Sequence, residues 1–442
     1  MGIAAINHKE ENVLSYLNDA LYQINHTGQE HCGIAVYQPL FYDDNKNIVR
    51  LSENGLVKEL KIPENLESYF GIGAVSKSRD HQPIYFENSP LGEFSIVFDG
   101  YIRNREQIKK DLGMGLLFGT DAEIAGQLIA KGDSFPDGIT RMSEEIDGCY
   151  CLCTISEEGV HAARDPTAMK PLLMGQGKRG FGIISDSRAF RKIGMYPTRD
   201  FEPGEIVQMD KYGIRKIKML PSKEIKHCSF LWGYYGWVDS VLDGIPVVLA
   251  RENAVRGVAE RDREAGIKID LVSAIEDSGK AYGEGYAEII GVPYKSTVIK
   301  YPYYPRSYDT AKPRRRSVAH GKVSTVDPRL EGKSVVLWDD SLRRGTVMRE
   351  MIDLIRKSGV AEIHLRFGTG RNTSFCTYDD RDQSDDVLPA NRYSTDKELA
   401  EHFGVDTLGF VTTQEFAQGI LEAQRMVGGD KIKLEDLCLD CY

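Results

Sequence analysis

The segment Val335–Val347 reads VVLWDDSLRRGTV and decides how the second half of this 442-residue chain folds. A short apolar run is followed by two acids, a Gly-containing turn and a helical pattern. The strand therefore delivers Asp339 and Asp340 to its C-terminal end, where ligands of open α/β sheets bind. The next helix offers unpaired N–H groups and a positive dipole end, so the segment predicts a binding site for a phosphate.

Two carboxylates would repel a phosphate on its own, so their position calls for a further ligand. Asp339 and Asp340 fit ribose hydroxyls and a magnesium ion, whose preferred ligands are oxygens. Ser341, Gly345 and Thr346 supply small side chains and close backbone approach to the phosphate. A lone Asp at this place would usually be a helix cap. The whole Asp-Asp-Ser-x-x-Arg-Gly-Thr pattern favours the ligand site, and it resembles the signature of type I phosphoribosyltransferases.

Composition and charge exclude several classes of protein. The net charge of −10 argues against a general nucleic-acid binder, and the one basic cluster, Lys312–Arg316, is local. No apolar run reaches the ~18 residues that a membrane span needs. The N-terminus lacks the features of a signal peptide. We therefore expect a cytoplasmic protein with no membrane or nucleic-acid partner.

The two halves of the chain show different patterns. Up to about residue 220, many short strands alternate with Gly and Pro, and only 11–24 and 121–130 are helical in pattern, which indicates an α+β layered domain. Beyond about residue 245, strand, loop, helix and strand follow one another, which indicates a parallel α/β sheet. We place the boundary so that residues 1–225 form the first domain and residues 226–442 the second.

Five further short motifs, spread over both halves of the chain, lie outside the phosphate loop. They are His26-Thr27-Gly28-Gln29, Phe98-Asp99-Gly100 with Asn104, Ala163-Arg164-Asp165-Pro166, Pro203-Gly204-Glu205 and Glu276-Asp277-Ser278. Together they cover nearly the whole chain, which resembles the glutamine phosphoribosylpyrophosphate amidotransferase family of purine synthesis. The resemblance implies an N-terminal-nucleophile αββα sandwich, which is a glutaminase, followed by a type I phosphoribosyltransferase domain. Ammonia would pass between the two sites.

The same resemblance assigns roles in the transferase site. Ser278 would help Asp339 and Asp340 bind magnesium, and Arg344 would join the phosphate loop. The lid that closes over phosphoribosyl pyrophosphate would carry Lys300, Tyr303 and Arg306, and the basic cluster Lys312–Arg316 would continue it. Such a lid neutralises the pyrophosphate and excludes water.

The eight cysteines fall into two groups. Cys32, Cys149, Cys151 and Cys153 lie in apolar strand patterns, where small buried thiols are common. The other four lie outside clear strands, and the last two form a Cys-x-x-Cys pair: Cys228, Cys376, Cys438 and Cys441. In one branch of the family four such cysteines hold an iron–sulfur cluster, so the resemblance implies a structural [4Fe–4S] cluster. Structural zinc is the alternative, because four thiolates suit both.

The glutaminase site departs from the family pattern at three places. Met1 stands where the family has its cysteine nucleophile, and a thioether cannot replace a thiolate. Ser76 replaces the Arg that grips the glutamine carboxylate. Asp99, before Gly100, replaces the oxyanion-hole Asn, and losing such a donor costs about 10²–10³ in rate. Asp121 keeps its place, but without the other groups we interpret it as a helix N-cap.

We therefore predict an enzyme that transfers phosphoribosyl from phosphoribosyl pyrophosphate to a nitrogen nucleophile. Free ammonia is the first candidate, which would give 5-phosphoribosylamine without glutamine hydrolysis. The alternatives are a different small nucleophile in a specialised pathway, or a catalytically silent paralogue that binds nucleotides and regulates a partner. The family resemblance implies a homo-oligomer, either a dimer or a tetramer.

Overall fold

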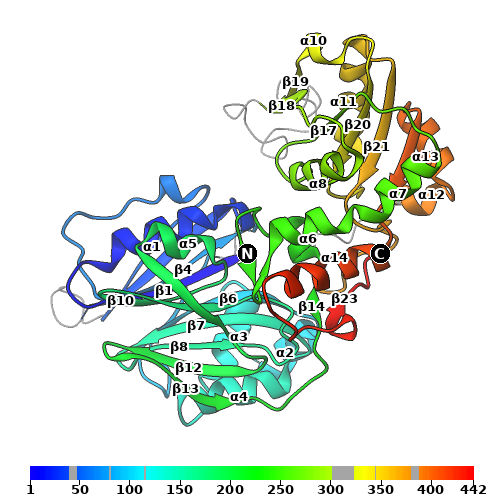
Figure 1. Ribbon diagram of the computed structural model, residues 1–442. Coiled ribbons are helices and arrows are strands. Elements are labelled where there is room, and N and C mark those ends of the chain that lie inside the picture. The colour runs from blue at the N-terminus through cyan, green and yellow to red at the C-terminus, as the bar shows by residue number, and fades with distance from the viewer. Residues whose placement is uncertain (39–46, 79–80, 114–115, 301–322, 344, 380–387) are drawn as a thin grey trace.

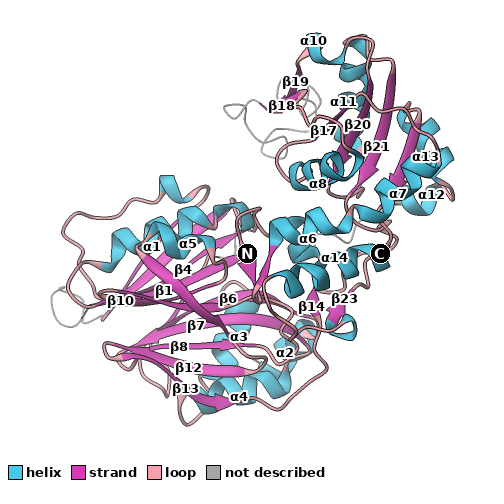
Figure 2. Ribbon diagram, in the orientation of Figure 1, coloured by secondary structure: helices cyan, strands magenta, loops and turns pink. Residues whose placement is uncertain are grey.

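A computed structural model describes residues 1–38, 47–78, 81–113, 116–300, 323–343, 345–379 and 388–442. In its N-terminal part, two antiparallel sheets lie face to face with helices on both outer sides (Figures 1 and 2). In its C-terminal part, a smaller parallel sheet is flanked by helices. None of the helices in these ranges is long and apolar enough to cross a membrane.

The two antiparallel sheets contain strands from the whole first half of the chain. The seven-stranded sheet has the order β11 (Met195–Asp200), β9 (Leu173–Gly177), β10 (Gly180–Ile184), β1 (Gly2–His8), β4 (Phe70–Ser76), β2 (His31–Tyr37) and β3 (Ile48–Glu53). The six-stranded sheet has the order β13 (Gly213–Met219), β12 (Glu205–Asp210), β8 (Gly159–Arg164), β7 (Gly148–Ser156), β6 (Phe94–Ile102) and β5 (Ile84–Phe86).

Strand β7 shows how the layers are held together. Cys151 and Cys153 point into the core between the two sheets, and Tyr150 and Leu152 point into the core under the outer helices. Successive side chains of a strand face opposite sides, so a central strand covered on both faces is apolar throughout. The interpretation of these cysteines as buried strand residues is confirmed.

The sandwich contains five helices among its described residues, three more than the sequence pattern predicted. Helices α1 (Val13–Gln23) and α5 (Arg188–Lys192) cover the seven-stranded sheet, while α2 (Arg105–Leu112), α3 (Asp121–Ile129) and α4 (Phe135–Glu145) cover the other. Helix α2 is too polar to show an apolar stripe, and α4 contains a Pro and a Gly, which are typical of loops. Pro136 lies in the first turn of α4, where a missing N–H costs nothing.

The C-terminal parallel sheet has the order β17 (Leu271–Ala274), β20 (Ser334–Asp339), β21 (Glu362–Phe367) and β22 (Thr407–Phe410). Its two faces are covered by different helices. One face packs on α7 (Arg256–Glu264) and α8 (Lys280–Ile290), the other on α11 (Thr346–Lys357) and α13 (Asp396–Phe403). Four shorter elements complete this part: β18 (Val298–Lys300), β19 (Val323–Thr325), α10 (Asp327–Leu330) and α12 (Pro389–Arg392).

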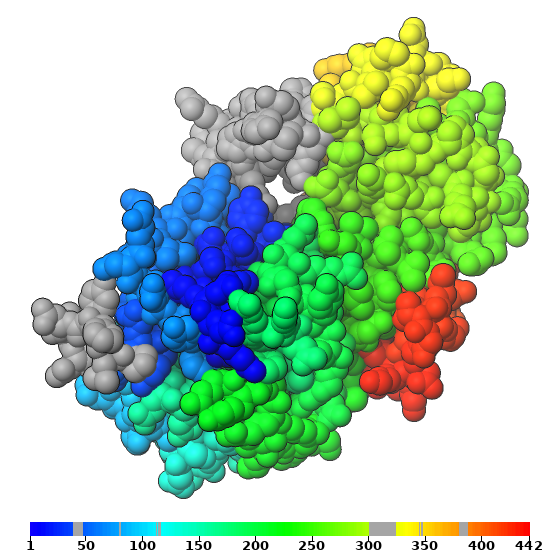
Figure 3. Space-filling model, turned by 60° about the vertical axis from the view of Figure 1, so that its left-hand side comes forward, coloured from blue at the N-terminus to red at the C-terminus, as the bar shows by residue number. Residues whose placement is uncertain are grey.

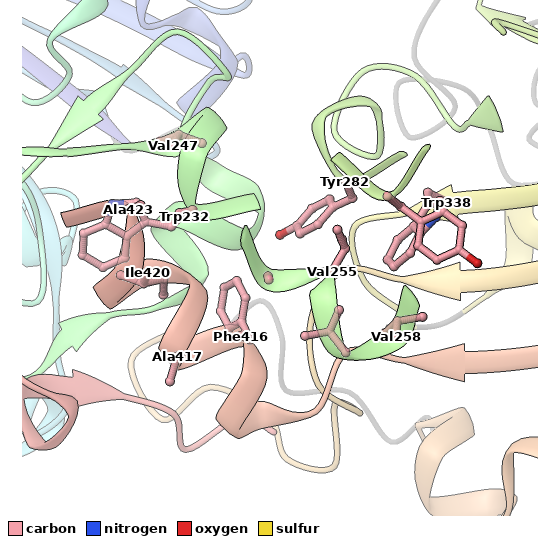
Figure 4. Packing of buried hydrophobic residues seen from close by; sticks show 14 of the residues in the cluster. Trp232, Val247, Val255, Val258, Tyr282, Trp338, Phe416, Ala417, Ile420 and Ala423 are labelled. Carbon is pink, nitrogen blue, oxygen red and sulfur yellow. The ribbon is translucent and has the colours of Figure 1, made fainter. Parts of the chain in front are cut away.

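A third set of elements joins the two parts. It comprises β14 (His227–Cys228), the π-helical turn η3 (Leu231–Tyr235), the hairpin β15 (Val241–Leu242) and β16 (Ile245–Pro246), α6 (Val247–Ala254), α14 (Thr413–Met426) and β23 (Leu437–Cys438). Figure 4 shows Trp232 on one side of their apolar core, Tyr282 and Trp338 on the other, and Phe416 between them. Helix α14 thus returns from the parallel sheet to the junction, and the C-terminal residues lie at its surface (Figure 3).

Candidate active site

The acid pair lies at the carboxyl end of β20, as the phosphate-loop pattern predicted. Asp339 ends the strand, and Asp340 follows it and is 6% exposed. The Asp340 carboxylate accepts a hydrogen bond from the Ser278 hydroxyl and a second, of 2.6 Å, from the Ser341 hydroxyl. Ser278 arrives from the loop before α8, so the fold brings together residues 62 positions apart.

Burial dominates the electrostatics of this acid pair. Burial, together with the charge of Asp340, raises the pKa of Asp339 well above its ordinary value. Burial also raises the pKa of Asp340, although Ser278 and Ser341 donate to it and oppose the shift. Two carboxylates and a hydroxyl are hard oxygen donors, so the residues present fit a divalent cation, which would reverse both shifts.

The turn after the acids has the backbone that a phosphate loop needs. Gly345 adopts φ +66° and caps the N-terminus of α11, and a Cβ there would lie 2.6 Å from the Phe403 ring. Only Gly fits both the left-handed backbone and this contact. Two further predicted site residues have a defined backbone position. Thr346 is the first residue of α11, and Lys300 is the last residue of β18. Arg344, Tyr303, Arg306 and the cluster Lys312–Arg316 lie outside the described residues.

The three substituted glutaminase positions, together with Gly100, lie at one end of the sandwich. Gly2 pairs with Val75, so Met1 and Ser76 lie side by side at the ends of β1 and β4. The Met1 amine lies 3.8 Å from the carboxylate of Asp99 in β6, and Gly100 follows Asp99 on the same strand. The predicted grouping of these residues therefore exists in the fold.

Sequence reasoning missed the residue that contacts Asp99 most closely. The Lys170 ammonium lies 3.2 Å from the Asp99 carboxylate, whose side chain is 5% exposed. Burial raises the pKa of Asp99, but Lys170 and the Met1 amine outweigh burial, and the net pKa is lowered. Asp99 is thus an ionised carboxylate paired with two cations. No local pattern distinguishes Lys170 from a surface lysine, so only the tertiary structure identifies it.

The interpretation of Asp121 as an N-cap is wrong. Thr120 caps α3, since its hydroxyl accepts from the Glu123 amide at 3.3 Å. Asp121 is the first residue of the helix, and its carboxylate accepts from the Ile102 amide at 3.1 Å. Its other oxygen lies 3.5 Å from the Arg105 guanidinium. The carboxylate therefore ties α3 to the end of β6, near Asp99 and Gly100.

The four unusual cysteines converge at the junction of the two parts. Cys228 and Cys438 are direct partners in the parallel pair β14–β23, and the Ser229 hydroxyl donates to the Cys438 carbonyl at 2.8 Å. The Cys441 carbonyl accepts from the Thr373 amide at 3.2 Å, which brings it to the loop that carries Cys376. These contacts bring together three segments that are distant in sequence.

The four thiols also interact electrostatically. Burial, together with the charges of the other three thiols, raises the pKa of Cys441 to about 12. Within the described ranges, however, no three His, Cys, Asp or Glu side chains are arranged to hold a metal ion. Four thiolates are suitable ligands for a metal ion or an iron–sulfur cluster. These four described side chains are not, however, arranged in a coordination geometry.

Comparison with known proteins agrees with both halves of this description. Residues 71–192 match the glutamine amidotransferase domain family and residues 248–369 match the phosphoribosyl transferase domain family. The chain is 30% identical to the amidophosphoribosyltransferase of Methanocaldococcus jannaschii over 98% of its own length and 94% of that protein. This chain belongs to the amidophosphoribosyltransferase family. The amidophosphoribosyltransferase of Bacillus subtilis is 28% identical over 93% of the chain and 88% of that protein.

The solved structures support the same family. Glutamine phosphoribosylpyrophosphate amidotransferase from B. subtilis, in complex with ADP and GMP, superposes with a TM-score of 0.88 at 26% identity, covering 100% of this chain and 96% of that one. The expected αββα sandwich followed by a type I phosphoribosyltransferase fold is therefore confirmed. The boundary between residues 225 and 226 stays a prediction, because the two family matches leave residues 193–247 unassigned.

Proposed function

We propose that this amidophosphoribosyltransferase-family protein transfers the phosphoribosyl group of phosphoribosyl pyrophosphate to ammonia, and that it does not hydrolyse glutamine. The products are 5-phosphoribosylamine and pyrophosphate. The observation that carries the proposal is a contrast between two sites. The acid pair of residues 339–340 has the setting of a transferase site, whereas Asp99 in the other site is already paired with Lys170. Residues 1–225 would be the inactive glutaminase domain and residues 226–442 the transferase domain.

The acid pair provides the first part of the mechanism. Asp339 and Asp340 would hold the ribose hydroxyls and, with Ser278, a magnesium ion. A magnesium ion bound there would neutralise negative charge on the departing pyrophosphate. The buried hydroxyl contacts of Asp340 keep its carboxylate in one orientation before substrate arrives. Such preorganisation lowers the barrier because little rearrangement remains in the transition state.

The phosphate loop and the lid complete the substrate site. Ser341, Arg344, Gly345 and Thr346 would bind the 5-phosphate, with the N-terminus of α11 directed at it. Lys300, Tyr303 and Arg306 would close over the pyrophosphate as it leaves a cationic, oxocarbenium-like ribose. Ammonia would then attack this carbon, and closure would keep water from competing.

The glutaminase site argues against glutamine as the nitrogen source. Met1 provides a thioether in place of a thiol, and Ser76 is too short to reach a substrate carboxylate as an Arg would. Asp99 carries a negative charge where an oxyanion would develop, and its partner Lys170 lies 3.2 Å from it. Each change alone would reduce glutamine hydrolysis, and all three occur at one end of the sandwich.

The cysteine centre belongs to the same proposal. Cys228, Cys376, Cys438 and Cys441 would hold a [4Fe–4S] cluster in a structural role, with zinc as the alternative. Convergence of four thiols at the junction supports it. A cluster at this place would clamp the C-terminal residues to the connecting segment.

The decisive experiment measures pyrophosphate release from phosphoribosyl pyrophosphate with magnesium and either ammonium chloride or glutamine. We expect release with ammonia and none above background with glutamine. A glutamine-dependent rate equal to the ammonia rate would disprove the loss of glutaminase activity. Absence of release with both nitrogen sources would disprove ammonia as the nucleophile and favour another small nucleophile or a regulatory paralogue.

A further inference from the structure

The motif that contains Arg164 has a structural role outside both sites. Arg164 ends β8, and its side chain is 1% exposed. It donates to both carboxylate oxygens of Asp243 at 2.6 and 2.9 Å. Its remaining donors reach the carbonyls of Ala168, Lys170 and Phe201 at 2.7–2.9 Å. All five N–H donors of the guanidinium are therefore used.

Asp243 does not belong to the sandwich. It occupies the turn between β15 and β16, with φ +49°, and is followed by Gly244 with φ +75°. Asp-Gly is a preferred sequence for such a left-handed hairpin turn. The turn inserts the Asp243 carboxylate into the sandwich, where Arg164 binds it. The hairpin leads directly into α6 and therefore into the transferase part of the chain.

A second carboxylate lies against the same turn. Asp200, at the end of β11, accepts a hydrogen bond from the Asp243 amide at 2.9 Å. The charged groups near the pair are the Arg164 guanidinium and the Lys431 ammonium, and the His227 ring lies 3.1 Å from Asp243. The Arg199 guanidinium binds both oxygens of Glu205 at 2.6 and 2.7 Å and also donates to the Asp200 carbonyl at 3.0 Å. The two acids therefore lie together beside one guanidinium, whose donors are all used by Asp243 and three backbone carbonyls.

We propose that Asp200, Asp243 and Arg164 form a pH-sensitive latch that holds the β15–β16 hairpin, and with it α6, against the N-terminal sandwich. With Asp200 neutral, Asp243 is the only charge that Arg164 must balance, and the hairpin is held. With Asp200 ionised, its charge repels that of Asp243 across the turn and the hairpin opens more often. The consequence reaches α6, because Val247 donates to the Ser240 carbonyl behind the hairpin at 3.0 Å.

The direction of the pH effect follows from the two carboxyl groups. Burial and the Asp243 charge raise the pKa of Asp200 to about 7 from an ordinary 3.8. Burial also acts on Asp243, but Arg164 and His227 outweigh it and hold its pKa far below the ordinary range. Asp200 thus binds a proton more tightly in the closed state, so the latch weakens as pH rises from about 4 to 7.

Hydrogen exchange of the intact protein tests the latch. Protection of the backbone amides of residues 240–250, corrected for the intrinsic exchange rate, would be measured from about pH 5.5 to about pH 8. For a group that shifts from 3.8 to about 7, the opening constant should rise about thirtyfold over this range. Asp200→Asn should abolish the rise, and the control Asp133→Asn, at a side chain that is 92% exposed, should retain it. Helix α1 serves as an internal reference that should not respond.

Two results would overturn the proposal. One is a wild-type opening constant that does not change with pH, a measurement that needs no variant. The other is an unchanged rise in Asp200→Asn, which would assign the pH dependence to a group other than Asp200. If Asp200→Asn does not fold, Asp200→Ser replaces it, since a hydroxyl can still accept from the Asp243 amide.

Discussion

The carboxylate of Asp99 lies 3.2 Å from the ammonium of Lys170, at the place where the family resemblance predicts the glutaminase site. Asp99 is 5% exposed and Lys170 is 28% exposed, so the pair is largely removed from water. If the proposed loss of glutaminase activity holds, this ion pair would help the N-terminal sandwich to keep its fold around the inactive site.

Removing one member of this pair should destabilise the protein. Asp99→Ala leaves the Lys170 ammonium buried without its carboxylate, which we expect to lower the free energy of unfolding by about 2–3 kcal/mol. The double variant Asp99→Asn with Lys170→Met should recover part of that loss, because neither charge remains. Urea denaturation measures both values. A double variant that is no more stable than Asp99→Ala would show that the pair is not the source of the effect.

The same pair predicts a pH dependence at acid pH. Burial raises the pKa of Asp99, but Lys170 and the Met1 amine outweigh it, and the net shift is downward. A carboxylate with a lowered pKa contributes stability above its ordinary pKa, near pH 4, and loses it as pH falls. Wild-type protein should therefore lose more stability between about pH 5 and pH 3 than the double variant does. Denaturation midpoints at matched ionic strength provide the comparison, and parallel curves would contradict the assignment.

Substitutions at the acid pair should separate catalysis from folding. Asp340→Asn should lower kcat/KM for phosphoribosyl pyrophosphate by roughly 10²–10³-fold, because a metal and ribose ligand is lost. Ser278→Ala should cost less, about tenfold, since it removes a group that orients Asp340. The exposed carboxylate of Asp353 on α11 offers a matched control, and Asp353→Asn should retain wild-type activity. Equal loss in the control would indicate a general electrostatic effect.

The proposed cysteine centre predicts that metal binding requires the four cysteines at the junction and not the cysteines of the sandwich. Protein purified without oxygen should be brown and contain iron near four atoms per chain, because four thiolates suit one [4Fe–4S] cluster. Cys438→Ser should lose the iron, whereas Cys32→Ala, in β2 of the sandwich, should keep it. Elemental analysis distinguishes the outcomes. One zinc per chain would support the alternative, and metal retained in Cys438→Ser would exclude this cysteine as a ligand.

Local patterns predicted much of the fold. The apolar run before Asp339, the helix from Thr346 and the strand from Glu362 all occur as expected, because each depends on side-chain periodicity within a few residues. Helices α2 and α4 were missed for the same reason. One is too polar to show an apolar stripe, and the other contains residues that are usually found in loops.

Some residues of the candidate sites could be predicted from the sequence, and others could be identified only from the tertiary structure. The sequence alone identified Asp339, Asp340 and the substitutions at Met1, Ser76 and Asp99, because each belongs to a short motif whose chemistry depends on residue type. Only the tertiary structure brought Lys170 to Asp99, Asp200 to the turn at Asp243, and Cys228 to Cys438. The residues in these contacts are separated by 43 positions (Asp200 and Asp243) to 210 positions (Cys228 and Cys438) along the chain. The physical reason is that these contacts depend on burial. A charge or a thiol is paired with its partner when packing removes both groups from water, and a local sequence pattern does not indicate which residue the partner is.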